Sequence, residues 1–364
     1  MCIARSSATQ RWHLRGHTPF SGTGWLSHLL RRFAIPLLAT ACSVLLSACV
    51  SSVLDVDQKA MQPIPAKLIG EMSAKHMSPA SPILVRIFKQ ESELEIWKRN
   101  ASGRYALLKT YPMCRWSGKL GPKKQSGDRQ APEGFYQVSV SMLNPRSQYY
   151  LSFDLGYPNR LEKALGYSGE SLMVHGACSS SGCYAMTDQG VAEIYAVVRE
   201  ALRGGQTSFQ VQALPFRMTP QNMARYSSDP NIEFWKNLKE GYDIFEVTRR
   251  QPKISACGGR YVFDAEFEGG EPADPLAACP PLVAQASPAL VAKREADSRA
   301  MQAAIASGSA FTTHAYSDGG MHPSFRAMLK SGGAKALAKK TSRTAVPVSR
   351  PDAALADPHS QADD

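Results

Sequence analysis

Short apolar runs separated by turn-forming residues dominate the chain between residues 82 and 263. Runs that are rich in β-branched and aromatic side chains and are bounded by Gly, Pro, Asn or Ser are typical of strands. The runs that fit this description are Ile83–Phe88, Leu94–Trp97, Tyr105–Leu108, Phe135–Val140, Leu151–Leu155, Ser171–Val174, Phe209–Val211 and Arg260–Phe263. Turn-like residues at 100–103 separate the second and third runs, which indicates a meander of hairpins.

A helical period replaces the strand pattern in two places. Apolar residues spaced as on one face of a helix predict the first helix; they are Val191, Ile194, Tyr195, Val198 and Leu202. Thr187 or Asp188 is suited to its N-cap, and the glycine pair at 204–205 to its end. Residues 231–241 predict a second helix that ends at Gly241.

Two segments follow neither period. Residues 118–135 hold four glycines and two prolines, so we expect a loop there. From residue 266 onward the chain is rich in Ala, Ser, Gly and Pro, and only three aromatic residues follow Pro280. Such a composition buries little apolar surface against its ordering entropy. We therefore expect residues 266–364 to be a low-complexity, mostly disordered tail, with short helices near 288–306 and 324–340.

The first 48 residues have the pattern of an export signal. Five arginines and no acidic residue are found there, and an apolar run covers residues 33–48. This run is shorter than the roughly 20 residues that cross a bilayer. It ends in Leu-Ser-Ala-Cys, which resembles a bacterial lipobox and predicts lipidation of Cys49. The alternatives are an ordinary secretory signal or an uncleaved anchor. We expect residues 49–80 to form a tether with one short helix, and residues 81–265 to form the folded domain.

Charge and motifs exclude several classes of function. The whole chain of 364 residues carries a net charge of +11, and removal of residues 1–48 with their five arginines leaves +6. No arginine-rich run with interleaved aromatic residues indicates nucleic-acid binding. The glycines at 118–134 lack the spacing of a phosphate-binding loop. Cys178 and Cys183 have the wrong spacing for a zinc knuckle. We expect no metal and no cofactor.

One histidine and one cysteine offer a nucleophile with its base. His175 is the only histidine between residues 77 and 313, and it precedes Cys183 by eight residues. A thiol becomes a nucleophile when a neighbouring base removes its proton. We expect His175 to act as general base and then acid, Gly182 to offer a backbone oxyanion donor, and Ser181 to orient the turn. A helix starting near Asp188 would lower the pKa of the thiol.

The remaining cysteines and the basic loop residues leave alternatives open. Without the signal and Cys49, five cysteines remain, namely Cys114, Cys178, Cys183, Cys257 and Cys279. An odd number leaves one thiol unpaired, and we expect this to be Cys183; the other four allow three pairings. In the other interpretation Cys183 is itself in a disulfide and His175 only fills a turn. Lys119 and Arg129 are candidates for binding substrate carboxylates, or are simply solvated.

The residues around Cys183 resemble the active-site signature of the YkuD-type L,D-transpeptidases, and most closely its YafK-like branch. The motif runs from His175-Gly176 to Ser181-Gly182-Cys183-Tyr184-Ala185-Met186-Thr187-Asp188, and the segments 117–122, 131–136, 215–219 and 234–238 also match. The resemblance covers about residues 80–265. It implies an α+β, β-rich, sandwich-like domain in the periplasm-facing cell envelope, with roles in cell-wall organization and cell shape. Cys183 would attack a carbonyl in a peptidoglycan stem peptide.

One departure from the family pattern affects the expected acceptor. Most of these transpeptidases have an arginine two residues after the cysteine, whereas this chain has Ala185. The YafK-like branch includes hydrolases that release a covalently bound lipoprotein from peptidoglycan. The resemblance therefore implies an acyl-transferase, with an amidase that uses water as the alternative. A non-catalytic wall-binding lipoprotein is the alternative from another class.

Overall fold

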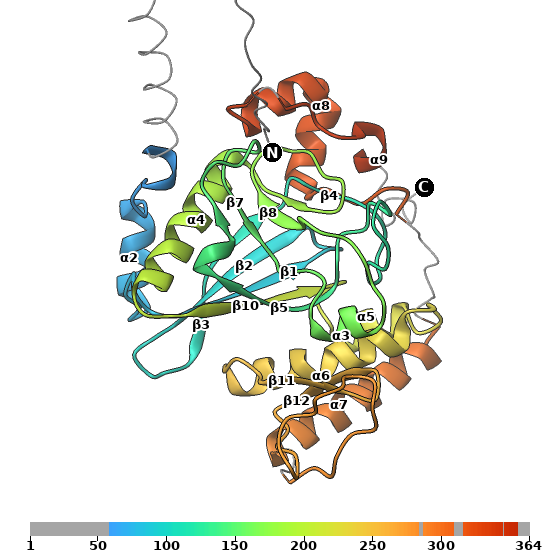
Figure 1. Cartoon of the computed structure of the whole chain (residues 1–364). Coiled ribbons are helices and arrows are strands. Elements are labelled where there is room, and N and C mark those ends of the chain that lie inside the picture. Colours follow the sequence, from blue (N-terminus) through green and yellow to red (C-terminus); the bar gives the residue numbers. More distant parts are fainter. Residues whose placement is uncertain (1–57, 284–286, 309–315, 345, 356–364) are drawn as a thin grey trace, which may run out of the picture. The chain divides into compact units, whose positions relative to one another are not determined.

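The computed structural model describes residues 58–283, 287–308, 316–344 and 346–355 (Figure 1). The predicted export signal, the predicted lipid acceptor Cys49 and the first part of the predicted tether lie outside these residues. Among the residues that are described, no helix combines the length and the apolar character that a membrane crossing requires.

A five-stranded sheet lies at the centre of the fold. Its strands are β1 (Ile83–Phe88), β2 (Glu93–Arg99), β3 (Tyr105–Pro112), β5 (Gly134–Ser139) and β10 (Ser208–Leu214), in the order β3-β2-β1-β10-β5. β1 and β10 are parallel, and the other neighbours are antiparallel. All six residues of β1 are buried, as expected for a central strand with both faces covered. All five strands lie where the apolar runs predict them.

The two faces of this sheet pack against different partners because successive side chains of a strand point to opposite sides. Val85 and Ile87 belong to the main core, together with helix α4 (Asp188–Arg203). Arg86 points to the other face, where helix α6 (Ile232–Thr248) covers it. Its guanidinium pairs with Glu246 at 2.5 Å and lies 4.4 Å from the ring centroid of Tyr242.

A second sheet of shorter strands carries the catalytic candidates. It consists of β4 (Arg115–Trp116), β6 (Leu143–Asn144), β7 (Ser152–Asp154), β8 (Met173–His175) and β9 (Tyr184–Ala185), in the order β4-β9-β8-β7-β6. The rings of Phe153 in this sheet and Phe209 in the larger sheet meet at 5.6 Å between centroids. The two sheets thus share one core, and the predicted α+β fold class is confirmed.

Helix α4 begins where the sequence predicts it. The N-cap is Thr187, whose side-chain oxygen accepts a hydrogen bond from the Gly190 amide at 2.9 Å. Helix α2 (Ala66–Ala74) buries Leu68 and Met72 in the main core. The described end of the predicted tether is therefore packed onto the domain through this helix.

Helix α6 extends beyond the predicted end at Gly241 and continues to Thr248. Gly241 is buried inside the helix, where a Cβ atom would meet Phe263 at 2.5 Å and Phe135 at 2.7 Å. The prediction that this glycine ends the helix is wrong. It is required by the close approach of two aromatic rings rather than by a turn.

The smaller elements complete the domain around α6. They are the 3₁₀ turn at Val140–Met142, α3 (Arg160–Ala164), α5 (Pro220–Arg225) and the hairpin of β11 (Ile254–Cys257) and β12 (Arg260–Phe263). The hairpin includes the last strand that the sequence predicts. Residues 118–133 form the predicted loop.

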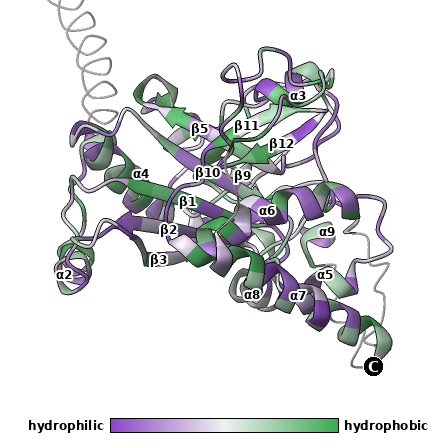
Figure 2. Cartoon of the chain, turned by 90° about the horizontal axis from the view of Figure 1, so that it is seen from below, coloured by the Kyte–Doolittle hydropathy of each residue, from purple (hydrophilic) through white to green (hydrophobic). Residues whose placement is uncertain are grey.

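The described part of the predicted tail holds three helices, namely α7 (Pro288–Ala306), α8 (Pro323–Thr341) and α9 (Pro351–Leu355). The first two lie where the sequence predicts short helices. Helix α7 contacts α5 and α6 and carries both hydrophilic and hydrophobic residues (Figure 2). Leu329 and Leu337 of α8 are buried. Residues 284–286, 309–315, 345 and 356–364 of the predicted tail lie outside the described residues.

Candidate active site

His175 and Cys183 are positioned by two adjacent parallel strands. His175 is the last residue of β8, and Cys183 immediately precedes β9. In the strand register, Val174 of β8 pairs with Tyr184 of β9. The short loop at residues 176–182 therefore connects β8 to the strand beside it in the sheet. Both side chains line one cavity of about 260 Å³, together with Asn144, Ser147, Gln148, Tyr149, Ser171 and Met173 and the serines at 179–181.

The thiol of Cys183 is free and partly exposed. Its sulfur accepts a hydrogen bond from the Met173 amide at 3.5 Å and donates to the Ser171 carbonyl at 3.6 Å. Burial raises the pKa of this thiol, and this outweighs the Met173 hydrogen bond, which lowers it. Desolvation therefore dominates the balance at this thiol.

The imidazole of His175 has a defined tautomer. Its Nδ1 lies 2.5 Å from the carbonyl oxygen of Gly176. A carbonyl only accepts, so Nδ1 carries the hydrogen and Nε2 keeps its lone pair for a proton. The ring also packs against Tyr149, at 4.6 Å between centroids. Burial lowers the pKa of His175 to about 4, against a smaller opposing effect of the Gly176 carbonyl.

These two shifts set the protonation states at neutral pH. The pKa of the imidazole lies far below 7 and that of the thiol is raised above its ordinary value, so both groups are neutral. The site therefore holds no thiolate–imidazolium ion pair at rest. A proton must move from sulfur to Nε2 as the sulfur attacks.

Ser180 organises the 176–182 loop from within. It is buried, and its hydroxyl donates to the Cys183 carbonyl at 2.7 Å and lies 3.0 Å from the hydroxyl of Ser117. The amide of Gly182 donates to the same Ser180 oxygen at 3.4 Å. The φ angle of +127° at Gly182 favours glycine. Among the three loop serines, the sequence selects Ser181, whereas the structure gives the central position to Ser180.

Asp188 fixes the start of the loop rather than the imidazole. Its carboxylate accepts from the Ala177 amide at 2.9 Å and from the Arg343 amide at 2.5 Å. A Cβ atom at Gly176 would meet this carboxylate at 2.5 Å and the Tyr149 carbonyl at 2.8 Å. The absence of a side chain at position 176 thus lets the loop approach Asp188 closely.

The two predicted substrate-binding cations occupy different positions. Lys119 is exposed and does not line the cavity. Arg129 reaches the loop: its guanidinium donates to the Ser181 hydroxyl at 3.0 Å and to the Ser180 carbonyl at 3.2 Å. It also pairs with Asp318 at 3.1 Å. Arg129 therefore lies beside the catalytic candidates, and Lys119 does not.

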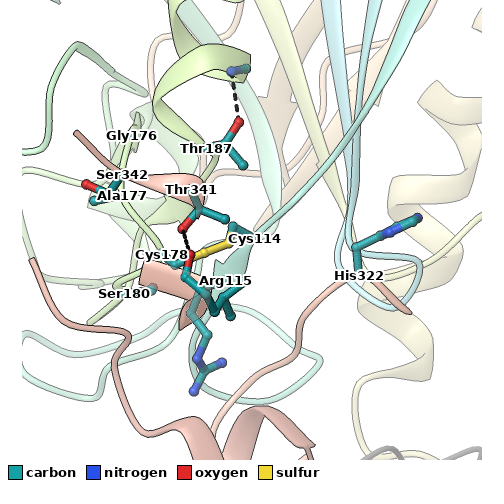
Figure 3. Close-up of a disulfide and its surroundings, with 12 residues drawn as sticks. Cys114, Arg115, Gly176, Ala177, Cys178, Ser180, Thr187, His322, Thr341 and Ser342 are labelled. Carbon is teal, nitrogen blue, oxygen red and sulfur yellow. Dashed lines mark hydrogen bonds between the residues drawn. A yellow bond between two sulfur atoms is a disulfide. The ribbon is translucent and has the colours of Figure 1, made fainter. Parts of the chain in front are cut away.

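Disulfides pair the other four cysteines. The pairs are Cys114–Cys178 and Cys257–Cys279, which is one of the three pairings that the sequence leaves open. Cys178 belongs to the 176–182 loop, so the first disulfide joins this loop to the residue that directly precedes β4 (Figure 3). Cys183 is left free, as predicted, which contradicts the interpretation that places it in a disulfide.

Ala185, at the position where the family pattern has an arginine, is fully buried in β9. The cavity lining includes no Asp, Glu, Lys or Arg side chain. A larger cavity of about 690 Å³ lies between Phe135 and the β11–β12 hairpin, and its lining includes no thiol and no imidazole. Within the described part of the chain, no cluster of three or more His, Cys, Asp or Glu side chains is arranged to hold a metal ion.

The chain is similar in sequence to known proteins of one family. A family model described as the YkuD L,D-transpeptidase catalytic domain matches residues 83–212. The Escherichia coli K12 protein named "Putative L,D-transpeptidase YafK" is 47% identical over 188 residues, which cover 52% of this chain and 76% of that protein. The protein of the same name from strain O157:H7 matches equally well.

Solved structures are also similar to the chain. The helical cell shape determining protein Pgp2 from Campylobacter jejuni has 18% identity and a TM-score of 0.31, over 52% of this chain and 79% of that one. Bd1075 from Bdellovibrio bacteriovorus has 14% identity and a TM-score of 0.27, over 48% and 76% respectively.

Proposed function

The chain belongs to the YkuD-type L,D-transpeptidase family, in its YafK-like branch, and is an L,D-transpeptidase-like enzyme; from this we propose a specific mechanism and substrate. The proposed reaction is acyl transfer through a thioester on Cys183, with a peptidoglycan stem peptide as acyl donor. The observation that carries the proposal is the pair of reactive groups in one cavity, with His175 fixed in the tautomer of a base.

In the first half-reaction the sulfur of Cys183 attacks a peptide carbonyl carbon while Nε2 of His175 takes the thiol proton. The C–N bond of the resulting tetrahedral intermediate then breaks. The imidazolium gives its proton to the departing amine, and the acyl group stays on sulfur as a thioester. The hydrogen bond from Nδ1 to Gly176 holds the ring in one orientation during both transfers.

In the second half-reaction an acceptor attacks the thioester. His175 removes a proton from the acceptor and returns it to the sulfur as the C–S bond breaks. An amine acceptor forms a new peptide bond, whereas water releases the free acid. The amide of Gly182 is the proposed oxyanion donor; it would exchange its 3.4 Å bond to Ser180 for the developing charge. Ser181 would orient the turn through its bond to Arg129.

The lining of the cavity bears on the acceptor. Position 185 supplies no guanidinium, because the residue there is an alanine that is buried in the sheet. The cavity wall offers hydroxyl and amide groups instead. The missing guanidinium supports an amidase as the second candidate function. This amidase would use water as the acceptor and release a covalently bound lipoprotein. Arg129, which donates to the cavity-lining Ser181, is the proposed contact for a substrate carboxylate, and the exposed Lys119 is a second candidate.

The proposed setting is the periplasm-facing envelope. The signal-like residues 1–48 and a lipid on Cys49 would export and anchor the enzyme within reach of peptidoglycan. The two disulfides of the described residues are consistent with an oxidising compartment.

The decisive experiment compares the wild type with Cys183→Ala on purified sacculi that carry bound lipoprotein. Mass spectrometry of the muropeptides and immunodetection of released lipoprotein are the two readouts. New cross-links identify the transferase, and free lipoprotein identifies the amidase. Ser331→Ala, an exposed change in α8, is the matched control and should behave as the wild type. Equal product from wild type and Cys183→Ala would refute the mechanism.

A further inference from the structure

The described residues 316–344 and 346–355, here called the C-terminal segment, lie against β4 and the 176–182 loop. They follow α7 and include α8 and α9. Figure 3 shows Thr341 and Ser342 of this segment beside the disulfide and the loop residues Ala177 and Cys178. Several independent contacts join the segment to the sheet and the loop that carry His175 and Cys183.

The first contact extends the catalytic sheet. Gly320 forms an antiparallel bridge with Trp116 of β4, with hydrogen bonds of 3.1 and 3.2 Å in the two directions. The ring of Tyr316 meets that of Trp116 at 4.8 Å between centroids. A Cβ atom at Gly319 would clash with the Trp116 carbonyl oxygen, so only glycine allows the chain to approach here. β4 is the edge strand of this sheet, and the segment covers its open side.

The second contact is apolar and surrounds the disulfide. Cys114 and Cys178 belong to a buried cluster whose other members all come from the C-terminal segment, namely Met321, Phe325, Leu329, Leu337, Val348 and Ala354. The disulfide at the base of the 176–182 loop is thus covered by residues that lie far from it in the sequence.

The third contact reaches the loop backbone directly. The hydroxyl of Ser349 accepts from the Ser180 amide at 2.9 Å and donates to the Ser180 carbonyl at 3.2 Å. The Ser349 amide donates to the Cys178 carbonyl at 3.3 Å. One serine therefore holds both backbone groups of Ser180, the residue whose own hydroxyl bonds the Cys183 carbonyl.

The fourth contact is electrostatic. Asp318 is buried and meets three guanidinium groups, those of Arg129 and Arg350 at 3.1 Å and that of Arg115 at 3.8 Å. Its other oxygen accepts from the Gly118 amide at 3.1 Å. Burial alone would raise the pKa of Asp318, but the Gly118 bond and Arg129 outweigh it and lower the pKa. The charged carboxylate fixes Arg129, which itself donates to Ser180 and Ser181.

We propose that the C-terminal segment is a positioning element of the active site, with Ser349 and Asp318 as its positioning residues. They act through Ser180 and Arg129 and hold the 176–182 loop so that Cys183 stays beside His175. The inference rests on the proposed function for its catalytic consequence. Its structural part, the placement of the thiol, is independent of the substrate.

The test uses the full chain with Ser349→Ala and Asp318→Asn, with Ser331→Ala as the matched control in the same segment. The rate of Cys183 alkylation by iodoacetamide is measured against pH, and kcat and KM are measured on soluble muropeptides. Loss of the Ser349 hydroxyl frees the loop and hydrates the thiol. Because burial raises the pKa of this thiol, we expect its alkylation at pH 7.5 to become several-fold faster.

We expect kcat to fall about ten- to a hundredfold in both variants, since the reacting groups are misplaced rather than lost. KM should change less than about twofold in Ser349→Ala, whereas Asp318→Asn also releases Arg129, the proposed contact for a substrate carboxylate, and should raise KM. Ser349→Thr, which keeps the hydroxyl, should restore most of kcat. All measurements are made well below each variant's unfolding midpoint, so that a general loss of stability is separated from a change in the loop.

The outcomes are distinguishable. If Ser349→Ala and Asp318→Asn match Ser331→Ala in alkylation profile and in kcat, the positioning role is overturned. If the wild type has no activity on muropeptides or sacculi while the alkylation profiles still differ, the proposed function fails and the positioning of Cys183 stands. Faster alkylation with lower kcat, and recovery in Ser349→Thr, supports both.

Discussion

The side chain of His175 is buried, and burial determines its protonation state. The pKa of the imidazole is lowered to about 4 because desolvation penalises the charged form more than the Gly176 carbonyl favours it. A base must be neutral to accept a proton. A buried imidazole with this pKa therefore stays functional at pH values where an ordinary histidine is already protonated.

This shift predicts an unusual acid limb of the pH–rate profile. At pH 5 roughly ninety per cent of an imidazole with a pKa near 4 is neutral, whereas an ordinary one is only a few per cent neutral. We expect kcat/KM to stay level from pH 7 to pH 5 and to fall only as the pH approaches 4. Rates on soluble muropeptides, with tryptophan fluorescence as a check of folding at each pH, measure this; a midpoint near 6.5 would contradict it.

The same shift affects stability with a defined sign. Between pH 6.5 and about 4 the unfolded chain binds a proton at position 175 that the folded chain does not. Above pH 6.5 the imidazole is neutral in both states, so its protonation does not lower the free energy of unfolding. As the pH falls from 6.5 to about 4, protonation of the unfolded chain lowers the free energy of unfolding progressively.

The residues of the candidate site differ in how well the sequence alone predicts them. The type and spacing of His175 and Cys183 are local properties, and these are enough to select both. The importance of Ser180 over Ser181 is not visible in the sequence, because it depends on Ser117 and Ser349, which are distant along the chain. The direction of the thiol pKa is not visible either, since burial is a property of the folded chain.

Among the secondary-structure elements, α6 shows why a glycine is ambiguous in a sequence. A glycine commonly ends a helix, but Gly241 lies within α6 because two aromatic rings occupy the space of its side chain. Gly70 in α2 is the opposite case: its backbone is helical, and no atom lies within 4 Å of the position that a methyl group would take. The sequence alone does not separate the two.

We predict opposite effects of the same substitution at these sites. Gly70→Ala should raise the free energy of unfolding by about 0.5 to 1 kcal/mol, because alanine loses less backbone entropy in a helix. Gly241→Ala should lower it by about 1 to 3 kcal/mol, because its methyl group displaces Phe263 or Phe135 from the core. Urea unfolding of both variants measures the difference, and a stabilising Gly241→Ala would show that the rings move aside freely.

The strands are the elements that the sequence predicts best, whereas the packing of the helices in the described tail is not visible in it. Alternation and β-branched runs identify β1, β2, β3, β5 and β10 without any tertiary information. The pattern also locates the helices at 288–306 and 323–341, but not their packing. Their sequence has few aromatic residues, and their burial depends on surfaces that the catalytic domain supplies.

For the whole molecule, the two disulfides have different places in the fold. Cys114–Cys178 joins residues 64 apart and lies between the 176–182 loop and the C-terminal segment, whereas Cys257–Cys279 joins residues 22 apart beside the β11–β12 hairpin. Loop-closure entropy alone gives about 4 and about 3 kcal/mol of stabilisation respectively. We thus expect the two disulfides to stabilise the fold to a similar degree. Only Cys114–Cys178 is attached to the loop of the active site.

We therefore predict a divergence between the two double variants. Cys114→Ala with Cys178→Ala should lower both the free energy of unfolding and kcat, because the loop that carries the nucleophile loses its covalent attachment. Cys257→Ala with Cys279→Ala should lower stability to a similar degree and leave kcat within about twofold of the wild type. Urea unfolding and muropeptide kinetics, both under non-reducing conditions, test this; equal losses of kcat would contradict it.

The bridge between Trp116 and Gly320 has a consequence for how copies of the protein meet one another. An open edge strand is a template on which another chain can add a strand, and this is a common route to aggregation. Here the chain's own later residues occupy the edge next to the nucleophile-bearing strands. Self-association through this edge would first require the protein to give up its own bridge, so the contact that completes the sheet also keeps neighbouring molecules apart.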